Sequence, residues 1–297
     1  MGSTGADACR RPLTAPVIRD RKVANGADRL VMVTAYDAPG SRAADAAGVD
    51  MILVGDSLAM VVLGYDDTLQ VTVADMAHHT AAVARARPSA LVVGDLPWMS
   101  YHVDRAETVR NAAALVRAGA GAVKLEGGRK RLAMVEAIVD AEIPVMGHIG
   151  LTPQSVRSLG GFKVQGRTSE GAVQLVSAAK ALAHAGAFAI VLEAIPDEVA
   201  RMVTDAVDVP TIGIGAGPHC DGQVLVYHDV LGIEERIRPK FSRRYAEQGA
   251  DATDALSRFA ADVRRGAFPG PEETYHLSAE VAETLGLYGA APSAERI

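Results

Sequence analysis

The sequence predicts an α/β protein built as a (β/α)8 barrel, the TIM-barrel fold, and three observations lead to this prediction. Short apolar runs rich in β-branched residues alternate with longer amphipathic stretches along the 297-residue chain. Near-continuous apolar strands that alternate with helices indicate a parallel sheet covered on both faces. Eight such units within about 200 residues favour a closed barrel. A doubly wound open sheet is the alternative.

Eight strands are expected, because each run is apolar, short and followed by polar residues or glycine. In chain order they are Val31–Ala35, Met51–Gly55, Ala90–Gly94, Ala122–Leu125, Pro144–Gly147, Phe188–Leu192, Thr211–Ile214 and Val224–Val226. The amphipathic stretches between them predict helices at Arg42–Ala47, Val73–Arg87, Arg105–Ala118, Arg129–Ala141, Ser169–Ala185 and Asp197–Val207.

Three junctions between a helix and the next strand repeat one pattern. They read AAGVDMILVGD from residue 46, RAGAGAVKLEG from 117 and HAGAFAIVLEA from 184. Each places a glycine (Gly48, Gly119 or Gly186) where a helix ends, directly before a buried strand. The repeated pattern supports a series of α/β units.

The domain organisation follows from these elements and from the absence of linkers or low-complexity tracts. We expect a flexible N-terminal extension at 1–15, a single barrel domain with a C-terminal helical addition at 16–275, and a C-terminal tail at 276–297.

Composition excludes several classes of function. The net charge of −6 and the lack of a Lys/Arg stripe exclude a nucleic-acid footprint. No apolar run reaches the roughly 20 residues that span a bilayer, and no secretory signal is visible. Cys9 and Cys220 form no CxxC pair, so neither a disulfide framework nor a zinc site is expected, and Cys220 is expected to be a buried, inert thiol. The expected setting is cytoplasmic, with small-molecule partners and neither nucleic acid nor membrane.

Polar side chains occur where the first six expected strands end. They are Tyr36 and Asp37, Asp56 and Ser57, Asp95, Lys124 and Glu126, His148, and Glu193. One Asp after a strand is often only a helix N-cap, and one His is often a satisfied core group. Their occurrence on consecutive strands favours an active site, because barrel enzymes build it at the carboxyl ends of their strands.

Three of these acids point to a metal. Neighbouring strands lie about 4.8 Å apart, so Asp56, Asp95 and Glu126 are expected in one small region. Their charges would raise one another's pKa unless a cation lies among them. Oxygen ligands indicate a hard ion, and Mg²⁺ is favoured. Partial neutralisation by Lys124 is the alternative.

Spacing also suggests how the remaining side chains are directed. Lys124 and Glu126 are two apart on one strand and so face the barrel mouth together. Glu193 is expected opposite the acids, where it can serve as an acid or base, with His148 between them. The glycines of GIGAGP at 213–218 permit either a phosphate site or a tight turn. His78 and His79 are expected on a solvated helix surface.

Nine ordered motifs resemble those of ketopantoate hydroxymethyltransferases, over residues 20–275. They are TAYD (34–37), LVGDS (53–57), GDLP..SY (94–101), VKLEGG (123–128), PVMGHIGLTPQ (144–154), GGFKVQG (160–166), VLEAIP (191–196), GIGAGPHCDGQVLV (213–226) and PKF..RYA (239–246). The resemblance implies a (β/α)8 barrel of the pyruvate/phosphoenolpyruvate superfamily type. It also implies a homo-oligomer, a decamer. Trp98 departs from the family pattern, in which Phe is common.

The resemblance implies a reaction and a role for each site residue. A one-carbon unit passes from 5,10-methylenetetrahydrofolate to 3-methyl-2-oxobutanoate through a metal-stabilised enolate, giving 2-dehydropantoate for pantothenate and coenzyme A biosynthesis. Asp56 and Asp95 would bind Mg²⁺ directly, and Glu126 would assist through water. Glu193 matches the catalytic glutamate, with His148 as the rival base. The residues expected to contact the 2-oxo acid are Asp56, Ser57, Asp95, Lys124 and His148.

Two other functions are compatible with such a barrel. One is a lyase or a phosphonomutase-like enzyme, although the reactive loop cysteine expected of the lyases is not evident. The other is a non-catalytic binding barrel, which the retained acids disfavour, because unpaired carboxylates in a pocket are costly.

Overall fold

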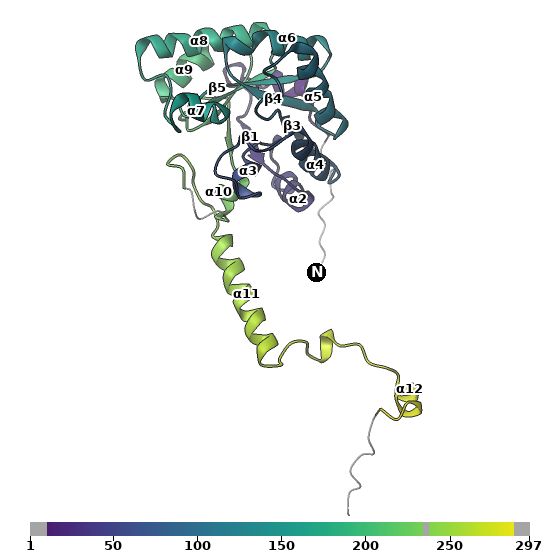
Figure 1. Cartoon of the computed structure of the whole chain (residues 1–297). Coiled ribbons are helices and arrows are strands. Elements are labelled where there is room, and N and C mark those ends of the chain that lie inside the picture. Colours follow the sequence, from purple (N-terminus) through teal and green to yellow (C-terminus); the bar gives the residue numbers. More distant parts are fainter. Residues whose placement is uncertain (1–10, 234–237, 288–297) are drawn as a thin grey trace, which may run out of the picture. The chain divides into compact units, whose positions relative to one another are not determined.

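The computed structural model, which describes residues 11–233 and 238–287, contains a closed barrel of eight parallel strands in chain order (Figure 1). The expected N-terminal extension and C-terminal tail therefore lie partly outside the described residues. The strands are β1 (Leu30–Thr34), β2 (Met51–Val54), β3 (Leu91–Asp95), β4 (Ala122–Glu126), β5 (Val145–Gly150), β6 (Ala189–Glu193), β7 (Thr211–Ile214) and β8 (Gly222–Leu225). The predicted fold is confirmed, with strand ends shifted by a few residues.

Closure of the barrel depends on the pairing of the first strand with the last. β1 pairs with β2 on one side and with β8 on the other, where Leu30 lies opposite Gly222 and Met32 opposite Val224. The chain-order neighbours complete the ring. An open doubly wound sheet is thereby excluded.

Side chains alternate between the barrel interior and the surrounding helices. On β4, Val123 and Leu125 are fully buried in the outer layer that packs on the helices, whereas Ala122 belongs to the inner cluster. Lys124 and Glu126 share the inward direction of Ala122 because side chains on a strand alternate with a period of two. This alternation places both charged groups inside the barrel mouth.

Helices cover the outer face between the strands. They are α2 (Ala38–Ala46), α4 (Val73–Ala84), α5 (Arg105–Arg117), α6 (Leu132–Asp140), α8 (Ser169–His184) and α9 (Asp197–Ala206). The short helices are α1 (Ala15–Arg19), α3 (Leu58–Val61), α7 (Val156–Leu159) and α10 (Tyr227–Leu231), and α1 packs Ala15 and Ile18 against the inner cluster of the barrel. Among these described helices, none is long and apolar enough to cross a membrane.

Two helix starts differ from the prediction. α2 begins at Ala38, ahead of the expected Arg42, because the Asp37 carboxylate accepts a hydrogen bond from Gly40 N and a proline fits the first turn. The helix expected from Arg129 begins with a 3₁₀ turn at Arg129–Arg131 and becomes α6 only afterwards.

The three junction glycines end helices as predicted. Gly48, Gly119 and Gly186 have φ angles of +79°, +110° and +96°, a region that favours glycine. A Cβ at Gly119 would lie 2.4 Å from that of Ala84. The glycine therefore also permits close packing of this turn on α4.

A buried ion pair closes the amino-terminal ends of the strands. Lys22 precedes β1, and its Nζ lies 2.9 Å from Asp221 Oδ2 and 2.8 Å from the Thr204 carbonyl oxygen. The same carboxylate accepts a hydrogen bond from Thr211 N, at the start of β7. The pair ties the segment before the barrel to its last two strands.

The chain divides into two compact units, residues 1–246 and 247–297. The second contains α11 (Gln248–Arg264) and α12 (Ala279–Thr284).

Candidate active site

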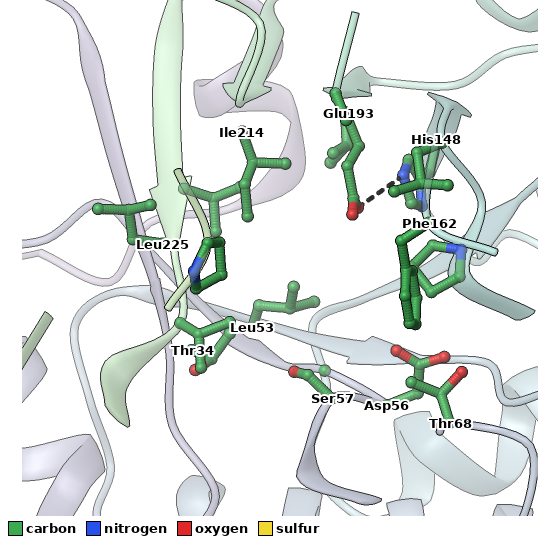
Figure 2. A pocket seen from close by; sticks show the side chains of 18 of the residues that line it. Thr34, Leu53, Asp56, Ser57, Thr68, His148, Phe162, Glu193, Ile214 and Leu225 are labelled. Carbon is green, nitrogen blue, oxygen red and sulfur yellow. Dashed lines mark ion pairs between the residues drawn. The ribbon is translucent and has the colours of Figure 1, made fainter. Parts of the chain in front are cut away.

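A cavity of about 470 Å³ opens where the barrel strands end at their carboxyl termini (Figure 2). The structure brings every predicted site residue to its wall. These are Asp56, Ser57, Asp95, Lys124, Glu126, His148 and Glu193. Figure 2 shows Glu193 and His148 on one side of the pocket, with Asp56, Ser57 and Thr68 on another.

Asp95 and Lys124 form the buried ion pair of the site. They are partners in the β3–β4 register, and Lys124 Nζ lies 2.8 Å from Asp95 Oδ2. The same oxygen accepts a hydrogen bond from Asp56 N at 3.3 Å. Asp95 is 1% exposed and Lys124 5%. One oxygen of Asp95 is thus held by two donors away from water.

Three carboxylates, those of Asp56, Asp95 and Glu126, share this buried region with the ammonium group of Lys124. Burial raises the pKa of Asp95 to about 7; Lys124 opposes this shift and Asp56 adds to it. Burial also raises the pKa of Glu126 well above its ordinary value, and Asp56 raises it further. Burial acts to lower the pKa of Lys124, but Asp95 and the other carboxylates outweigh it and raise that pKa. Lys124 therefore stays positively charged, and Asp95 and Glu126 are costly to ionise in this region unless a further cation is present.

The site has the donors that a hard divalent cation requires. Asp95 Oδ1 is buried and has no hydrogen-bond partner. Among the described residues, no three His, Cys, Asp or Glu side chains form a ready-made metal cluster. Mg²⁺ needs no such cluster, because it binds through one or two carboxylates and takes its other oxygens from water and substrate. The residues present fit Mg²⁺ in that manner.

His148 lies between two glutamates, as the sequence predicts. Its Nε2 lies 3.2 Å from Glu193 Oε2 and its Nδ1 3.6 Å from Glu126 Oε2, although neither ring nitrogen is aligned for a hydrogen bond. Burial and Lys124 lower the pKa of His148 more than Glu193 raises it. His148 is therefore neutral near pH 7.

Gly150 allows β5 and β6 to approach at this point. Its φ is +99°, and a Cβ there would lie 2.2 Å from the Glu193 carbonyl oxygen. That same carbonyl accepts a hydrogen bond from Leu151 N at 2.8 Å. The glycine thus holds the chain after His148 against the end of β6, which carries Glu193.

The end of β1 supports Ser57. Tyr36 OH and Ser57 Oγ lie 2.9 Å apart in a hydrogen bond, and burial raises the pKa of Tyr36. Asp37, which follows the same strand, serves as the N-cap of α2 and does not line the pocket. Of the polar residues after β1, Tyr36 is therefore the one connected to the site.

Gln154 is a site residue that reasoning from the sequence missed. It is 4% exposed and lies in the 3₁₀ turn Pro153–Ser155 after β5. It hydrogen-bonds Asp56 through its side chain and Glu126 through its backbone. A signal was present, because the residue ends the motif PVMGHIGLTPQ, but the sequence does not show where a loop side chain points.

The outer part of the cavity is apolar, with cations at its rim. It includes Phe162, Lys163 and Val164 from the loop before α8, and Lys240 and Phe241 from the segment after α10. Phe162 is 55% exposed and Phe241 39%.

The GIGAGP glycines support this outer wall. Gly215 has a φ of +64°, and a Cβ there would lie 2.7 Å from Phe241 Cδ1. Gly217 has a φ of +73°, and its Cβ would lie 2.3 Å from that of Asp197. The structure favours tight turning and close packing for this motif.

Other expectations concerned Cys220 and the paired histidines. Cys220 is fully buried, and burial raises the pKa of its thiol to about 11, so it is the inert thiol that was predicted. His78 is exposed as expected. The prediction for His79 is wrong: it is half-buried, and its Nδ1 lies 2.7 Å from the Tyr36 carbonyl oxygen.

We expect the difference in free energy of unfolding between the cation-free wild-type protein and Asp95→Asn to fall as pH rises from about 4 to about 7. The pKa of Asp95 rises from 3.8 to about 7 on folding, so the native state binds more protons than the unfolded state in this interval. The slope is up to about 1.4 kcal/mol per pH unit for one such group. Urea denaturation in a chelating buffer at several pH values measures it. A difference between wild type and Asp95→Asn that does not fall across this interval would contradict the assignment.

The chain matches a family model described as ketopantoate hydroxymethyltransferase over residues 13–271. The 3-methyl-2-oxobutanoate hydroxymethyltransferase 2 of Bradyrhizobium diazoefficiens is 55% identical over 90% of this chain and 91% of its own. The 3-methyl-2-oxobutanoate hydroxymethyltransferase of Ignicoccus hospitalis is 58% identical over 85% of this chain and 96% of its own.

Solved structures share the fold at lower sequence identity. A 2,3-dimethylmalate lyase, described as a PEP mutase/isocitrate lyase superfamily member, superimposes with a TM-score of 0.57 at 20% identity, covering 93% of this chain and 96% of its own. A phosphonopyruvate hydrolase in complex with oxalate and Mg²⁺ gives 0.56 at 14% identity, covering 92% and 95%. At this identity the likeness shows the barrel alone.

Proposed function

Because the chain belongs to the ketopantoate hydroxymethyltransferase family, we propose that it transfers a one-carbon unit from 5,10-methylenetetrahydrofolate to 3-methyl-2-oxobutanoate. The products are 2-dehydropantoate and tetrahydrofolate, a step of pantothenate and coenzyme A biosynthesis. The cytoplasmic setting and the homo-oligomer, a decamer, that the family resemblance implies are further parts of this proposal.

One observation carries the assignment of chemistry: a buried group of carboxylates with a single lysine and one unpartnered carboxylate oxygen, at the base of the cavity. Asp56, Asp95 and Glu126 are the proposed Mg²⁺ residues. When bound, Mg²⁺ would supply the positive charge that favours the enolate form of the oxo acid.

Lys124 supports binding of an anionic substrate. It lines the cavity, remains charged, and its position is fixed by the ion pair with Asp95. A buried ammonium at this place can neutralise the carboxylate or the developing enolate oxygen of the oxo acid. Ser57, Asp56, Asp95 and His148 line the same part of the cavity and complete the proposed oxo-acid contacts.

Glu193 is the proposed base that removes the C3 proton. Its side chain is 16% exposed, whereas that of His148 is 2% exposed, so the glutamate is the more accessible to substrate. His148 lies beside it, with Nε2 3.2 Å from Glu193 Oε2, and a small rotation of either side chain would let it donate a hydrogen bond to the carboxylate. The other possible base, His148, also lines the cavity but is more deeply buried.

The apolar outer part of the cavity is the proposed place for the folate. The five-carbon oxo acid is small beside the cavity volume of about 470 Å³, so room remains for a second reactant. Phe162, Val164 and Phe241 offer surfaces on which a planar ring can pack. A folate there would present its methylene carbon from the open side of the site.

The test of this proposal is deuterium exchange at C3 of 3-methyl-2-oxobutanoate, followed by NMR with Mg²⁺ and without folate. The wild-type protein should exchange the C3 proton, and Glu193→Gln should slow the exchange by about 10²- to 10⁴-fold, because the amide cannot accept the proton.

The control is Glu198→Gln, which changes an exposed glutamate in the first turn of α9 and should exchange normally. Full-rate exchange by Glu193→Gln would remove Glu193 from the role of base. The absence of exchange and of product formation in the wild-type protein would overturn the proposed function.

A further inference from the structure

Gln154 connects three strand ends of the site from a loop. Its Nε2 donates to Asp56 Oδ2 at 2.9 Å and to the Leu96 carbonyl oxygen at 3.0 Å, and its Oε1 accepts from Tyr101 OH at 2.6 Å. Its backbone N–H donates to Glu126 Oε1 at 2.8 Å. One buried residue therefore holds the acids that follow or end β2 and β4.

The orientation of this amide is fixed by its partners. Leu96 O can only accept, and the Asp56 carboxylate accepts when ionised, so both require the NH₂ group of the amide. A flipped amide would place Oε1 against two acceptors and turn NH₂ toward the Tyr101 hydroxyl. The network allows one arrangement of the Gln154 side chain.

Each of the three acids thus has one oxygen held by donors of the protein. In Asp56 it is Oδ2, held by Gln154. In Asp95 it is Oδ2, held by Lys124, and in Glu126 it is Oε1, held by the Gln154 backbone. Of the second oxygens, that of Asp95 is buried without a hydrogen-bond partner, and that of Glu126 lies 3.6 Å from His148 Nδ1.

We propose that Gln154 is a positioning residue, which holds one oxygen of Asp56 and one of Glu126 so that the second oxygen of each turns toward the cation. It acts through these carboxylates and is not among the residues that line the cavity. Tyr101, 1% exposed, acts one step further away by orienting the amide. This inference rests on the Mg²⁺ site of the proposed function.

The deciding variant is Gln154→Met, which keeps the length of the side chain and the backbone N–H but removes the amide. We expect its Mg²⁺ dissociation constant, measured by calorimetry with and without the oxo acid, to rise about 10- to 100-fold. The lost turnover should be recovered at high Mg²⁺ concentration, which a merely structural defect would not allow.

Two further variants keep the test decisive. Gln174→Leu, on the exposed face of α8, is the matched control and should bind Mg²⁺ as the wild type does. Tyr101→Phe removes one oxygen atom, and it should weaken Mg²⁺ binding several-fold with little change in the thermal midpoint. If Gln154→Met does not fold, the Mg²⁺ affinity of Tyr101→Phe tests the positioning role instead.

The outcomes separate this inference from the proposed function. A folded Gln154→Met protein that binds Mg²⁺ within two-fold of wild type, or whose turnover does not recover at high Mg²⁺, overturns the positioning role alone. If Gln154→Met does not fold, unchanged Mg²⁺ affinity in Tyr101→Phe overturns it. Failure of the wild-type protein to bind Mg²⁺ overturns the proposed metal site itself.

Discussion

Asp95→Asn is expected to abolish measurable Mg²⁺ binding and to lower kcat/KM by about 10³-fold or more, the size of effect seen when a central electrostatic group of an active site is lost. The substitution keeps the shape of the side chain and removes its charge. It also replaces a buried, unpartnered carboxylate oxygen, the atom best placed to meet a cation. Calorimetry and steady-state kinetics of the same preparation measure both effects.

Stability gives this prediction an internal check. Asp95 shares its surroundings with Asp56 and Glu126, so removal of its charge relieves repulsion in the cation-free protein while it weakens the contact with Lys124. We expect a thermal midpoint near that of wild type without Mg²⁺, and a smaller rise when Mg²⁺ is added. Asp205→Asn, on the exposed face of α9, is the matched control. Undiminished Mg²⁺ binding by Asp95→Asn would remove Asp95 from the metal site.

Lys124→Met is expected to lower the free energy of unfolding by about 3–5 kcal/mol at pH 8, the usual loss when one partner of a buried ion pair is removed. Three acids then lie in the same buried region without their counter-charge. We also expect a large increase in KM for the oxo acid, because the ammonium proposed to neutralise its anionic group is gone.

The pH dependence identifies the cause of this loss. Burial raises the pKa of Asp95 to about 7 and also raises that of Glu126, so Asp95 takes up a proton as pH falls through about 7 and the unbalanced charge declines. The stability difference between Lys124→Met and wild type should therefore be smaller at pH 5 than at pH 8. Urea denaturation at both values measures it, with Lys180→Met on the exposed face of α8 as control. A difference that does not change with pH would point to lost packing of the lysine stem instead.

The sequence predicted the barrel and the strand-end part of the site for the same physical reason. A parallel strand is a short apolar run, and its carboxyl end is a fixed position, so Asp95 and His148 could be located from the run that precedes each. The closing of the barrel then brings these ends together without any knowledge of side-chain contacts.

Residues that reach the site from loops could not be found in this way. Gln154 contacts Asp56 across 98 positions of the chain, and no periodicity predicts where its side chain points. His79 looked like a surface residue because its partner is a backbone carbonyl, that of Tyr36, which leaves no trace in the sequence. The start of α6 was missed since propensity does not separate a 3₁₀ turn from the first turn of an α-helix.

The ion pair between Lys22 and Asp221 affects which substitutions this protein can tolerate. It joins the amino-terminal ends of the strands, whereas the cavity lies at their carboxyl ends, so this pair contributes to stability without contacting the cavity. Substitutions of Lys22 or Asp221 should shorten the lifetime of the native protein without changing its substrate. Exposed residues of the cavity wall can in turn change without loss of this pair.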